Sequence, residues 1–398
     1  MFFSFRNFFK FFYRTLFRKR KDPREPVPRR IGGFVLFYFL FFLLEVVTWI
    51  GFLADEIFFR GYKKKEVWQP VFIVGNPRSG TTFLHRLLAR DEANFAFMRT
   101  WEMVFAPSIT LRRVLKGLRA ADRVLGCPMQ RLIDAQQRRW QEGNVMHKIA
   151  LRAPEEDEYL LFHIWSSLKI WLYVALLDEA IPYTYFDTAM PESEKERIMT
   201  FYKRCLQRHL YAADTDRKHY LAKNPSFTPM IDTLYDYFPD AKIIYLARNP
   251  LDMIPSFISL KEREWELLDQ PIQDDRSREY VLDMAQHWYN YPLERLERVS
   301  KGNYVIVNFD DLVQKAESTV ARIYKRFGLQ MGPAFARVLR KEGEKSRSYD
   351  SDHEYSLEEM GLTHEEIVKE YRGIFSRFGF DTRGEAVKVK VDSRAKKK

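Results

Sequence analysis

A glycine-rich stretch in the first quarter of the chain has the residues to bind an anion. It spans residues 75–82 and reads GNPRSGTT. The apolar, β-branched run Val71–Val74 precedes it and predicts a buried strand, and apolar residues follow it at helical spacing. A strand, a tight glycine turn and a helix direct backbone N–H groups and the positive end of a helix dipole toward one point. The stretch therefore predicts a phosphate-type anion site.

This loop differs from the Walker A motif of nucleotide hydrolases, which reads G-x-x-x-x-G-K-[ST]. Gly75 and Gly80 have the correct spacing and Thr82 keeps the final hydroxyl, but Thr81 occupies the position of the lysine. Arg78 supplies the nearby cation, and its planar guanidinium can hold an oxyanion with two hydrogen bonds. These residues predict anion binding without ATP hydrolysis.

A second group of polar residues follows two other predicted strands. Lys223 ends the predicted strand Tyr220–Pro225, and Arg248 ends the predicted strand Lys242–Leu246. Ser256 comes eight residues after Arg248 on the next predicted helix. A charged fork on a strand end and a hydroxyl on a helix can converge on one phosphate. We therefore expect a second anion contact here.

At these residues the sequence resembles the PAPS-dependent sulfotransferases, in particular the bacterial-type members whose loop reads PRSGTT. The resemblance extends over roughly residues 67–380, including the FDDL block after a late predicted strand. It implies that Lys223 neutralises the leaving phosphate and that Arg248 and Ser256 hold the 3′-phosphate of the donor, 3′-phosphoadenosine 5′-phosphosulfate (PAPS). It also implies that the 5′-phosphosulfate is held by the loop residues Arg78, Ser79, Gly80, Thr81 and Thr82.

The general base is not fixed by the resemblance. In the cytosolic branch of the family a histidine two residues beyond the lysine has this role, but that position here is Pro225. Glu102 is a candidate because it lies near the expected carboxyl end of a strand within residues 94–103, where ligand sites gather. It is the first choice because the resemblance implies that a Glu soon after the first helix commonly acts as the base. His147 is the alternative, because an imidazole titrates near neutral pH. The acidic cluster 155–158 resembles a family block, but it also suits the first turn of a helix.

The predicted fold class is α/β, a P-loop-like three-layer fold with a central parallel sheet flanked by helices. Residues 67–382 are predicted to form the catalytic domain, and 383–398 a basic disordered tail. Lys341–Tyr355 is expected to be a loop, in which Lys345 and Arg347 are candidates for closing over the donor. No set of residues with the spacing of metal ligands is recognisable, so no metal is expected.

The N-terminal region predicts an association with membranes. Residues 1–30 include a basic amphipathic segment, and residues 31–66 contain the apolar run 31–53, which is long enough to cross a bilayer. Three arrangements are open for this run: a monotopic or re-entrant hairpin, a single spanning helix, or a helix buried against the domain. The first of these, with a cytoplasmic catalytic domain, is our interpretation, and a single-pass protein is the alternative.

Charge and composition narrow the class of partner. The net charge is +11, of which residues 1–30 carry +8 and residues 388–398 carry +5, so the body between them is slightly acidic at −2. A nucleic-acid-binding domain usually carries its basic excess on the folded body, so no nucleic acid is expected as a partner. With two cysteines, Cys127 and Cys205, the chain has no disulfide framework.

Together these features predict transfer of a sulfuryl group from PAPS to a hydroxyl of a lipid, glycolipid or other small molecule. One rival is a nucleotide-dependent kinase that uses the same loop, against which the absent lysine and the Arg248–Ser256 pair argue. The other rival is a membrane-bound scaffold on an inactive fold, which would predict loss of the donor residues.

Overall fold

The computed structural model describes residues 2–17, 27–143, 151–215, 217–267, 275–347, 357 and 360–382. At its centre is a parallel sheet of five strands in the order β2-β3-β1-β4-β5. The strands are β1 (Val71–Gly75), β2 (Phe95–Ala96), β3 (His219–Lys223), β4 (Lys242–Ala247) and β5 (Tyr304–Asn308). The α/β fold class with a central parallel sheet is confirmed, as are the four longer strands.

The position of β1 in the middle of the sheet explains its apolar sequence. It pairs with β3 through Val71 and Leu221 on one side, and with β4 through Gly75 and Leu246 on the other. Helices cover both faces, so every residue of β1 is buried. Because neither face meets water, the strand is a continuous apolar run and does not alternate.

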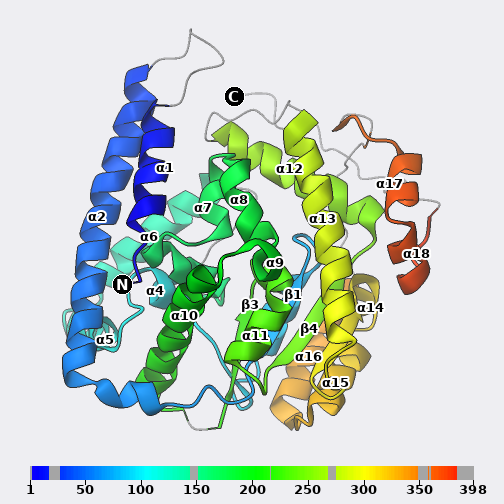
Figure 1. Cartoon of the computed structure of the whole chain (residues 1–398). Helices are drawn as coiled ribbons and strands as arrows, with labels where there is room; N and C mark the ends of the chain where they lie inside the picture. Colours follow the sequence, from blue (N-terminus) through cyan, green and yellow to red (C-terminus); the bar gives the residue numbers. More distant parts are fainter. Residues whose placement is uncertain are drawn as a thin grey trace, which may run out of the picture.

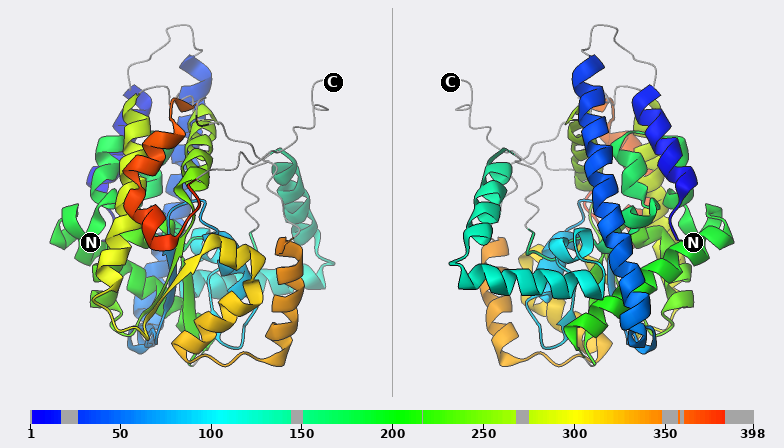
Figure 2. Two further views of the ribbon diagram at one scale, coloured as in Figure 1. Left: turned by 90° about the vertical axis from the view of Figure 1, so that its right-hand side faces the viewer. Right: turned by 90° about the vertical axis from the view of Figure 1, so that its left-hand side faces the viewer.

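One face of the sheet packs on the helix after the anion loop and on helices near the C-terminus. These are α3 (Thr81–Leu88), α14 (Phe309–Gln314), α15 (Ala316–Phe327) and α16 (Pro333–Arg347). Figures 1 and 2 show this layer beside the strands. The buried side chains Val71 and Ile73 of β1 point into it.

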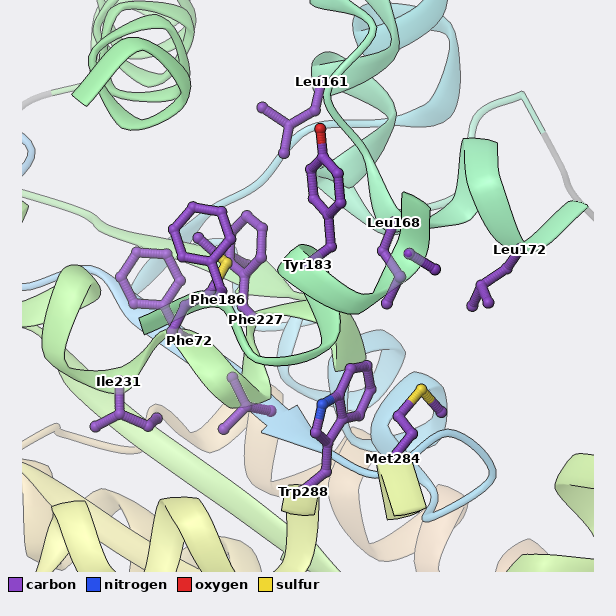
Figure 3. Close-up of a cluster of buried hydrophobic side chains, with 14 of the residues drawn as sticks. Phe72, Leu161, Leu168, Leu172, Tyr183, Phe186, Phe227, Ile231, Met284 and Trp288 are labelled. Carbon is purple, nitrogen blue, oxygen red and sulfur yellow. The ribbon is translucent and has the colours of Figure 1, made fainter. Parts of the chain in front are cut away.

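The other face packs on a larger set of helices and 3-10 turns. These are α4 (Thr100–Val104), η2 (Asp157–Ile164), α7 (Leu168–Tyr173), α8 (Leu177–Thr184), α9 (Phe186–Ala189), α10 (Glu192–Ala213), η3 (Pro225–Met230), α11 (Ile231–Tyr237), α12 (Pro250–Leu267), α13 (Asp275–Leu296), α17 (His364–Glu370) and α18 (Arg372–Phe378). Phe72 of β1 lies here beside Phe186 and Phe227, and Trp288 and Met284 of α13 complete the cluster in Figure 3.

Two sequence predictions about local structure are wrong. Residues 94–103 form a strand only at Phe95–Ala96, and Glu102 lies in helix α4, because its carboxylate accepts the backbone N–H of Arg99 at 2.7 Å and so caps the helix start. The segment from Lys341 begins as helix and not as loop, since α16 continues to Arg347 and buries Phe335 and Leu339 on one side. The rest of that predicted loop, residues 348–355, lies outside the described residues.

The N-terminal region forms two helices, α1 (Phe5–Phe17) and α2 (Val27–Phe58), which lie side by side along one flank of the domain (Figures 1 and 2). The hydroxyls of Thr15 and Tyr38 join them at 2.8 Å. Helix α1 also contacts the domain, because the side-chain amide of Asn7 donates to the carbonyl of Trp165 at 2.8 Å. Within the described residues, Gly32–Phe58 is the one helix long and apolar enough to cross a membrane.

Candidate active site

The residues predicted to bind the donor meet at the carboxyl edge of the sheet. The chain leaves β1 toward β2 and β3 on one side, and later forms β4 and β5 on the other, so the strand order reverses at β1. Ligand sites of open α/β sheets lie at this kind of switch point. The loop 76–80, Lys223 and Arg248 all follow or end strands at this edge.

The loop after β1 depends on two glycines. Gly75 has a φ of +142°, and an added Cβ would lie 2.3 Å from the carbonyl oxygen of Leu246 on the neighbouring strand. Gly80 has a φ of +83°, and a Cβ there would lie 2.6 Å from the ring of Phe309. Side chains are strained at such φ values, so both positions require glycine.

The loop also contains an unpaired polar group. The Ser79 side chain is fully buried, and its Oγ has no hydrogen-bond partner among the described residues. Helix α3 begins two residues later at Thr81, and the first N–H groups of a helix have no partner within it. A buried hydroxyl beside a helix N-terminus fits an oxyanion, which would accept hydrogen bonds from both.

The structure joins the two predicted halves of the site. Nε of Arg78 donates to Oγ of Ser256 at 2.9 Å, and Nη1 of Arg248 donates to the carbonyl of Arg78 at 3.0 Å. Tyr289 holds the backbone of Arg248 through a hydrogen bond of 2.6 Å from its hydroxyl to the carbonyl oxygen. Residues some 170 positions apart in the chain thus form one cluster.

Arg248 is poorly neutralised. Its guanidinium stacks on the ring of Phe309 at 4.5 Å, and its Nε lies 3.9 Å from Asp252 without a hydrogen-bond partner in the described part of the chain. Burial lowers its pKa, and Asp252 opposes that shift. Asp310 opposes the shift as well, but neither carboxylate is hydrogen-bonded to Nε. A desolvated guanidinium whose Nε lacks a hydrogen-bond acceptor favours an incoming anion.

Lys223 lies in a network that the sequence revealed only in part. Its Nζ donates to Thr82 Oγ1 at 3.2 Å and to Glu156 Oε1 at 2.7 Å. The second oxygen of Glu156 contacts the ammonium group of Lys169, from the first turn of α7. Burial alone would raise the pKa of Glu156, but the two lysines hold it well below its usual range. Glu156 is therefore an ionised counter-ion between two cations.

The nearby His85 on α3 does not add a charge. Its imidazole is buried, and burial together with the charge of Lys223 lowers its pKa to about 3. It is therefore neutral at ordinary pH, and the positive charge beside Thr82 comes from the lysines.

The other acidic residues of the cluster 155–158 hold their segment in place. Glu155 pairs with Arg86 of α3 at 2.6 Å, and Glu158 accepts a hydrogen bond of 2.7 Å from Ser226. Asp157 accepts from Tyr220 of β3 at 3.1 Å, and burial raises its pKa to about 6. These contacts bind the segment to β3 and α3, and so place Glu156 beside Lys223.

Of the two predicted bases, the structure describes one. The buried carboxylate of Glu102 caps α4 and lies 3.6 Å from the guanidinium of Arg112, so neither of these contacts is with the anion loop. His147 lies outside the described residues. Sequence reasoning missed the role of Glu156 and did not consider Lys169, because their pairing joins segments with no shared motif. The acidic cluster after Pro154 was the one available signal.

No metal cluster is visible in the described ranges: nowhere in them do three or more His, Cys, Asp or Glu side chains come together in a way that could hold a metal ion. The positive charge at the edge of the sheet is supplied by side chains of the protein.

Comparison with known proteins agrees with this architecture. Residues 70–333 match the model of the sulfotransferase family. The chain is 27% identical over 364 residues to the omega-hydroxy-beta-dihydromenaquinone-9 sulfotransferases of Mycobacterium tuberculosis and Mycobacterium bovis, covering 85% of this chain and 83% of theirs.

Two crystal structures of mycobacterial sulfotransferases share the fold. The Mycobacterium avium sulfotransferase STF9 aligns with a TM-score of 0.66 and 20% identity, over 84% of this chain and 83% of that one. The Mycobacterium tuberculosis sulfotransferase STF1 aligns with a TM-score of 0.60 and 21% identity, over 81% of each chain. Since the family match spans the loop, β3, β4 and the residues that they position, the chain belongs to the sulfotransferase family.

Proposed function

We propose that this protein transfers a sulfuryl group from PAPS to the hydroxyl of a lipid-like acceptor at a membrane. The observation that carries the proposal is the pair of hydrogen bonds that connects Arg78 with Ser256 and with Arg248. It links the anion loop to a second pair of anion-binding groups, and a donor with phosphates at two ends of a nucleoside needs two such sites. A donor with a single phosphate chain would not need the second.

The residues proposed to bind the donor form two groups, one for each end of the nucleotide. The 5′-phosphosulfate is assigned to the loop, through Arg78, the Ser79 hydroxyl and the N–H groups of Gly80, Thr81 and Thr82. The 3′-phosphate is assigned to Arg248 and Ser256, whose guanidinium and hydroxyl already lie together. On binding, the anion would replace the contact of Arg78 with Ser256 and meet the free Nε of Arg248.

The chemical step is an in-line displacement at sulfur. The acceptor oxygen forms a bond to sulfur, the bond from sulfur to the 5′-phosphate oxygen breaks, and the electron pair stays on that phosphate. Lys223 would neutralise the new charge, since its ammonium group is fixed 3.2 Å from the hydroxyl of Thr82. Lys169 adds a second cation near the same point. Catalysis would rest on positioning and electrostatics, without a metal.

The acceptor proton passes to a carboxylate or an imidazole. Glu102 and His147 are the bases that the sequence predicted, and we add Glu156, whose carboxylate lies beside Lys223. Its low pKa keeps it ionised and so able to accept a proton, although two lysines weaken it as a base. Glu102→Gln, His147→Gln and Glu156→Gln variants separate the three. Loss of the base removes the acidic limb of the pH profile for kcat, whereas loss of a positioning group leaves its shape unchanged.

Two observations support a lipid acceptor. The matched mycobacterial proteins are named for an omega-hydroxy menaquinone-type lipid, and they align over most of both chains. This chain also carries the long apolar helix α2 on its flank. A glycolipid or another membrane-delivered hydroxyl has the same chemistry. PAPS is made in the cytosol of cells, so we propose that the catalytic domain is cytoplasmic.

The test is calorimetric titration of the full chain with adenosine 3′,5′-bisphosphate. We expect micromolar binding, weakened at least about tenfold in Arg248→Ala, because a charge-assisted pair contributes about 1.5–3 kcal/mol. Arg377→Ala is the matched control, since it removes an exposed arginine paired with Glu297 at 2.7 Å. Folded protein that does not bind the bisphosphate would overturn the proposal, and binding of ATP with Mg²⁺ in its place would favour a kinase.

A further inference from the structure

Helix α2 has inverted polarity. The side that faces the domain carries its polar residues Glu45, Thr48 and Asp55, all of them buried. The side that faces outward carries large apolar residues, which are Val35, Leu36, Phe37, Phe39, Leu40, Phe42, Leu43, Val46, Val47, Ile50, Leu53, Ile57 and Phe58. A helix on the surface of a water-soluble domain has the opposite arrangement.

The inner side of α2 is attached to the domain by charged contacts. Glu45 Oε1 lies 2.6 Å from Nδ1 of His163, whose Nε2 lies 2.9 Å from the carbonyl of Met103 in α4. One turn from the end of α2, Asp55 pairs with Nε of Arg208 in α10 at 3.1 Å. The helix is therefore part of the domain, because the carboxylates of Glu45 and Asp55 have their partners there.

The packing of α2 on α5 (Ile109–Val124) shows the same close attachment. Asp55 accepts the backbone N–H groups of Ile109 and Thr110, each at 2.8 Å, so a residue of α2 caps the start of α5. An added Cβ at Gly51 would lie 2.5 Å from Oγ of Ser108. Glycine at this position allows the two helices to approach each other closely.

The outer side has no comparable partner in the described chain. Of the most apolar 18-residue window of α2, 17% is buried. An exposed apolar surface of more than a few hundred Å² is unusual on a water-soluble protein and marks an interaction surface. Neighbouring helices also carry exposed apolar residues, with Phe5 and Phe9 on α1, and Val114 and Leu118 on α5.

The charges around this surface identify the partner. Arg6 and Lys10 are exposed on α1, and Arg60, Lys63 and Lys64 follow the end of α2. Two of these five cations also pair with carboxylates of the protein, Lys10 with Glu179 and Lys63 with Glu56. A wide apolar side flanked by Lys and Arg is typical of elements that lie in the interface of an anionic bilayer.

We propose that the outer side of α2, together with the exposed phenylalanines of α1, is embedded in one leaflet of an anionic membrane, so that α2 lies on the bilayer and does not cross it. If α2 crossed the bilayer, its inner side and the groups packed against it would lie in the hydrocarbon, where ionisable side chains are costly. Here the inner side carries Asp55 with Arg208 and Glu45 with His163, and the domain would have to enter the hydrocarbon with them. The proposal is independent of the donor and acceptor assignments.

The first experiment measures binding of the full chain to vesicles. Wild type should bind vesicles of phosphatidylcholine with phosphatidylglycerol more tightly than phosphatidylcholine alone. Ile50→Glu/Leu53→Glu should reduce this partition at least about tenfold, because a carboxylate is costly in the apolar layer. Ile50→Met/Leu53→Met is the matched control and should bind as wild type does. Both positions are exposed, so neither variant disturbs the packed side of α2.

The second experiment separates lying on the membrane from crossing it. Single cysteines at Arg6 and at Lys64 are placed in a Cys127→Ser background and labelled with a membrane-impermeant maleimide in sealed membrane vesicles. The proposal expects both cysteines to react from the same side. Labelling from opposite sides would overturn it in favour of a spanning helix. Binding of the double-Glu variant equal to wild type, or a dimer that this variant converts to monomer, would overturn the lipid assignment.

Discussion

The carboxyl edge of the sheet and the interface between α2 and the domain both bury charged side chains, but they balance them differently. At the interface, Asp55 faces Arg208 and Glu45 faces His163, so each charge has a partner of opposite sign. At the sheet edge, cations exceed carboxylates: Glu156 is shared by two lysines, and Arg248 has its nearest carboxylate at 3.9 Å. Buried charges that are paired with charges of opposite sign hold the structure together, whereas an excess of buried charge of one sign favours binding of a ligand of the opposite sign.

The largest expected effect comes from unbalancing the interface with Asp55→Ala. Arg208 would then keep only its 2.9 Å pair with Glu56 and the start of α5 would lose its cap, which should lower the free energy of unfolding by up to about 3–5 kcal/mol. Urea unfolding of the full chain in detergent measures this change. Glu297→Ala breaks an exposed pair and should cost less than about 1 kcal/mol. Equal effects of the two variants would contradict the comparison.

At the sheet edge, Lys223→Met should affect turnover more than folding. Removing the cation nearest the developing phosphate charge should lower kcat about 100- to 1000-fold. Affinity for the bisphosphate should change less than kcat, because the loop and Arg248 remain. Kinetics with a labelled donor and a lipid hydroxyl, beside calorimetry, measure the two quantities. Lys325→Met, on the exposed side of α15, should leave both unchanged. A stability loss as large as that of Asp55→Ala would identify Lys223 as structural.

Sequence patterns predicted the sheet edge well because its geometry is local. The strand, glycine turn and helix at residues 71–88 follow one another directly, and Arg248 and Ser256 lie within one strand–helix unit. Their meeting follows from the parallel order of β1 and β4. Glu156 and Lys169 were harder to find, because their contact depends on how η2 folds over β3.

The arrangement of α2 could not be derived from hydropathy. An average over the helix is the same whether its polar residues face lipid, water or a protein partner, so three arrangements stayed open. The partners that hold its inner side on the domain, His163 and Arg208, lie more than a hundred residues away. Glu102 was placed at a strand end for a related reason: alternation over a few residues does not exclude a short capped helix.

Gly80→Ala tests whether the anion loop requires glycine at this position. The substitution is strained at a φ of +83° and brings Cβ against the ring of Phe309. We expect a cost of about 1–3 kcal/mol, shared between stability and bisphosphate binding. Thermal unfolding and calorimetry measure both. Gly117→Ala on α5 has nothing within 4 Å of the new Cβ and should be neutral or slightly stabilising. Unchanged binding in Gly80→Ala would show that the loop can relax.

The smallest expected effect is a pH dependence at the interface. Burial lowers the pKa of His163, but Glu45 more than compensates, so the pKa is raised above its ordinary value of 6.5. The ion pair therefore stabilises the fold fully below the unfolded-state pKa, and this contribution is lost as pH rises through the folded-state pKa. Glu45→Gln should be less stable than wild type by about 1 kcal/mol at low pH, with the difference shrinking as pH rises. Urea unfolding at a series of pH values checks this. A constant difference would exclude titration of His163.

The position of β1 in the middle of the sheet has a consequence for how the chain is made. Val71 pairs with Leu221, about 150 residues later in the sequence. At a synthesis rate of about 5–20 residues per second, β1 and the outer side of α2 leave the ribosome roughly 8 to 30 s before β3 is available. During this time the apolar strand β1 and the apolar outer side of α2 are both exposed, because β1 lacks its neighbour β3. Delivery to the membrane during translation, and not after it, would shelter one of them from aggregation while the sheet is still incomplete.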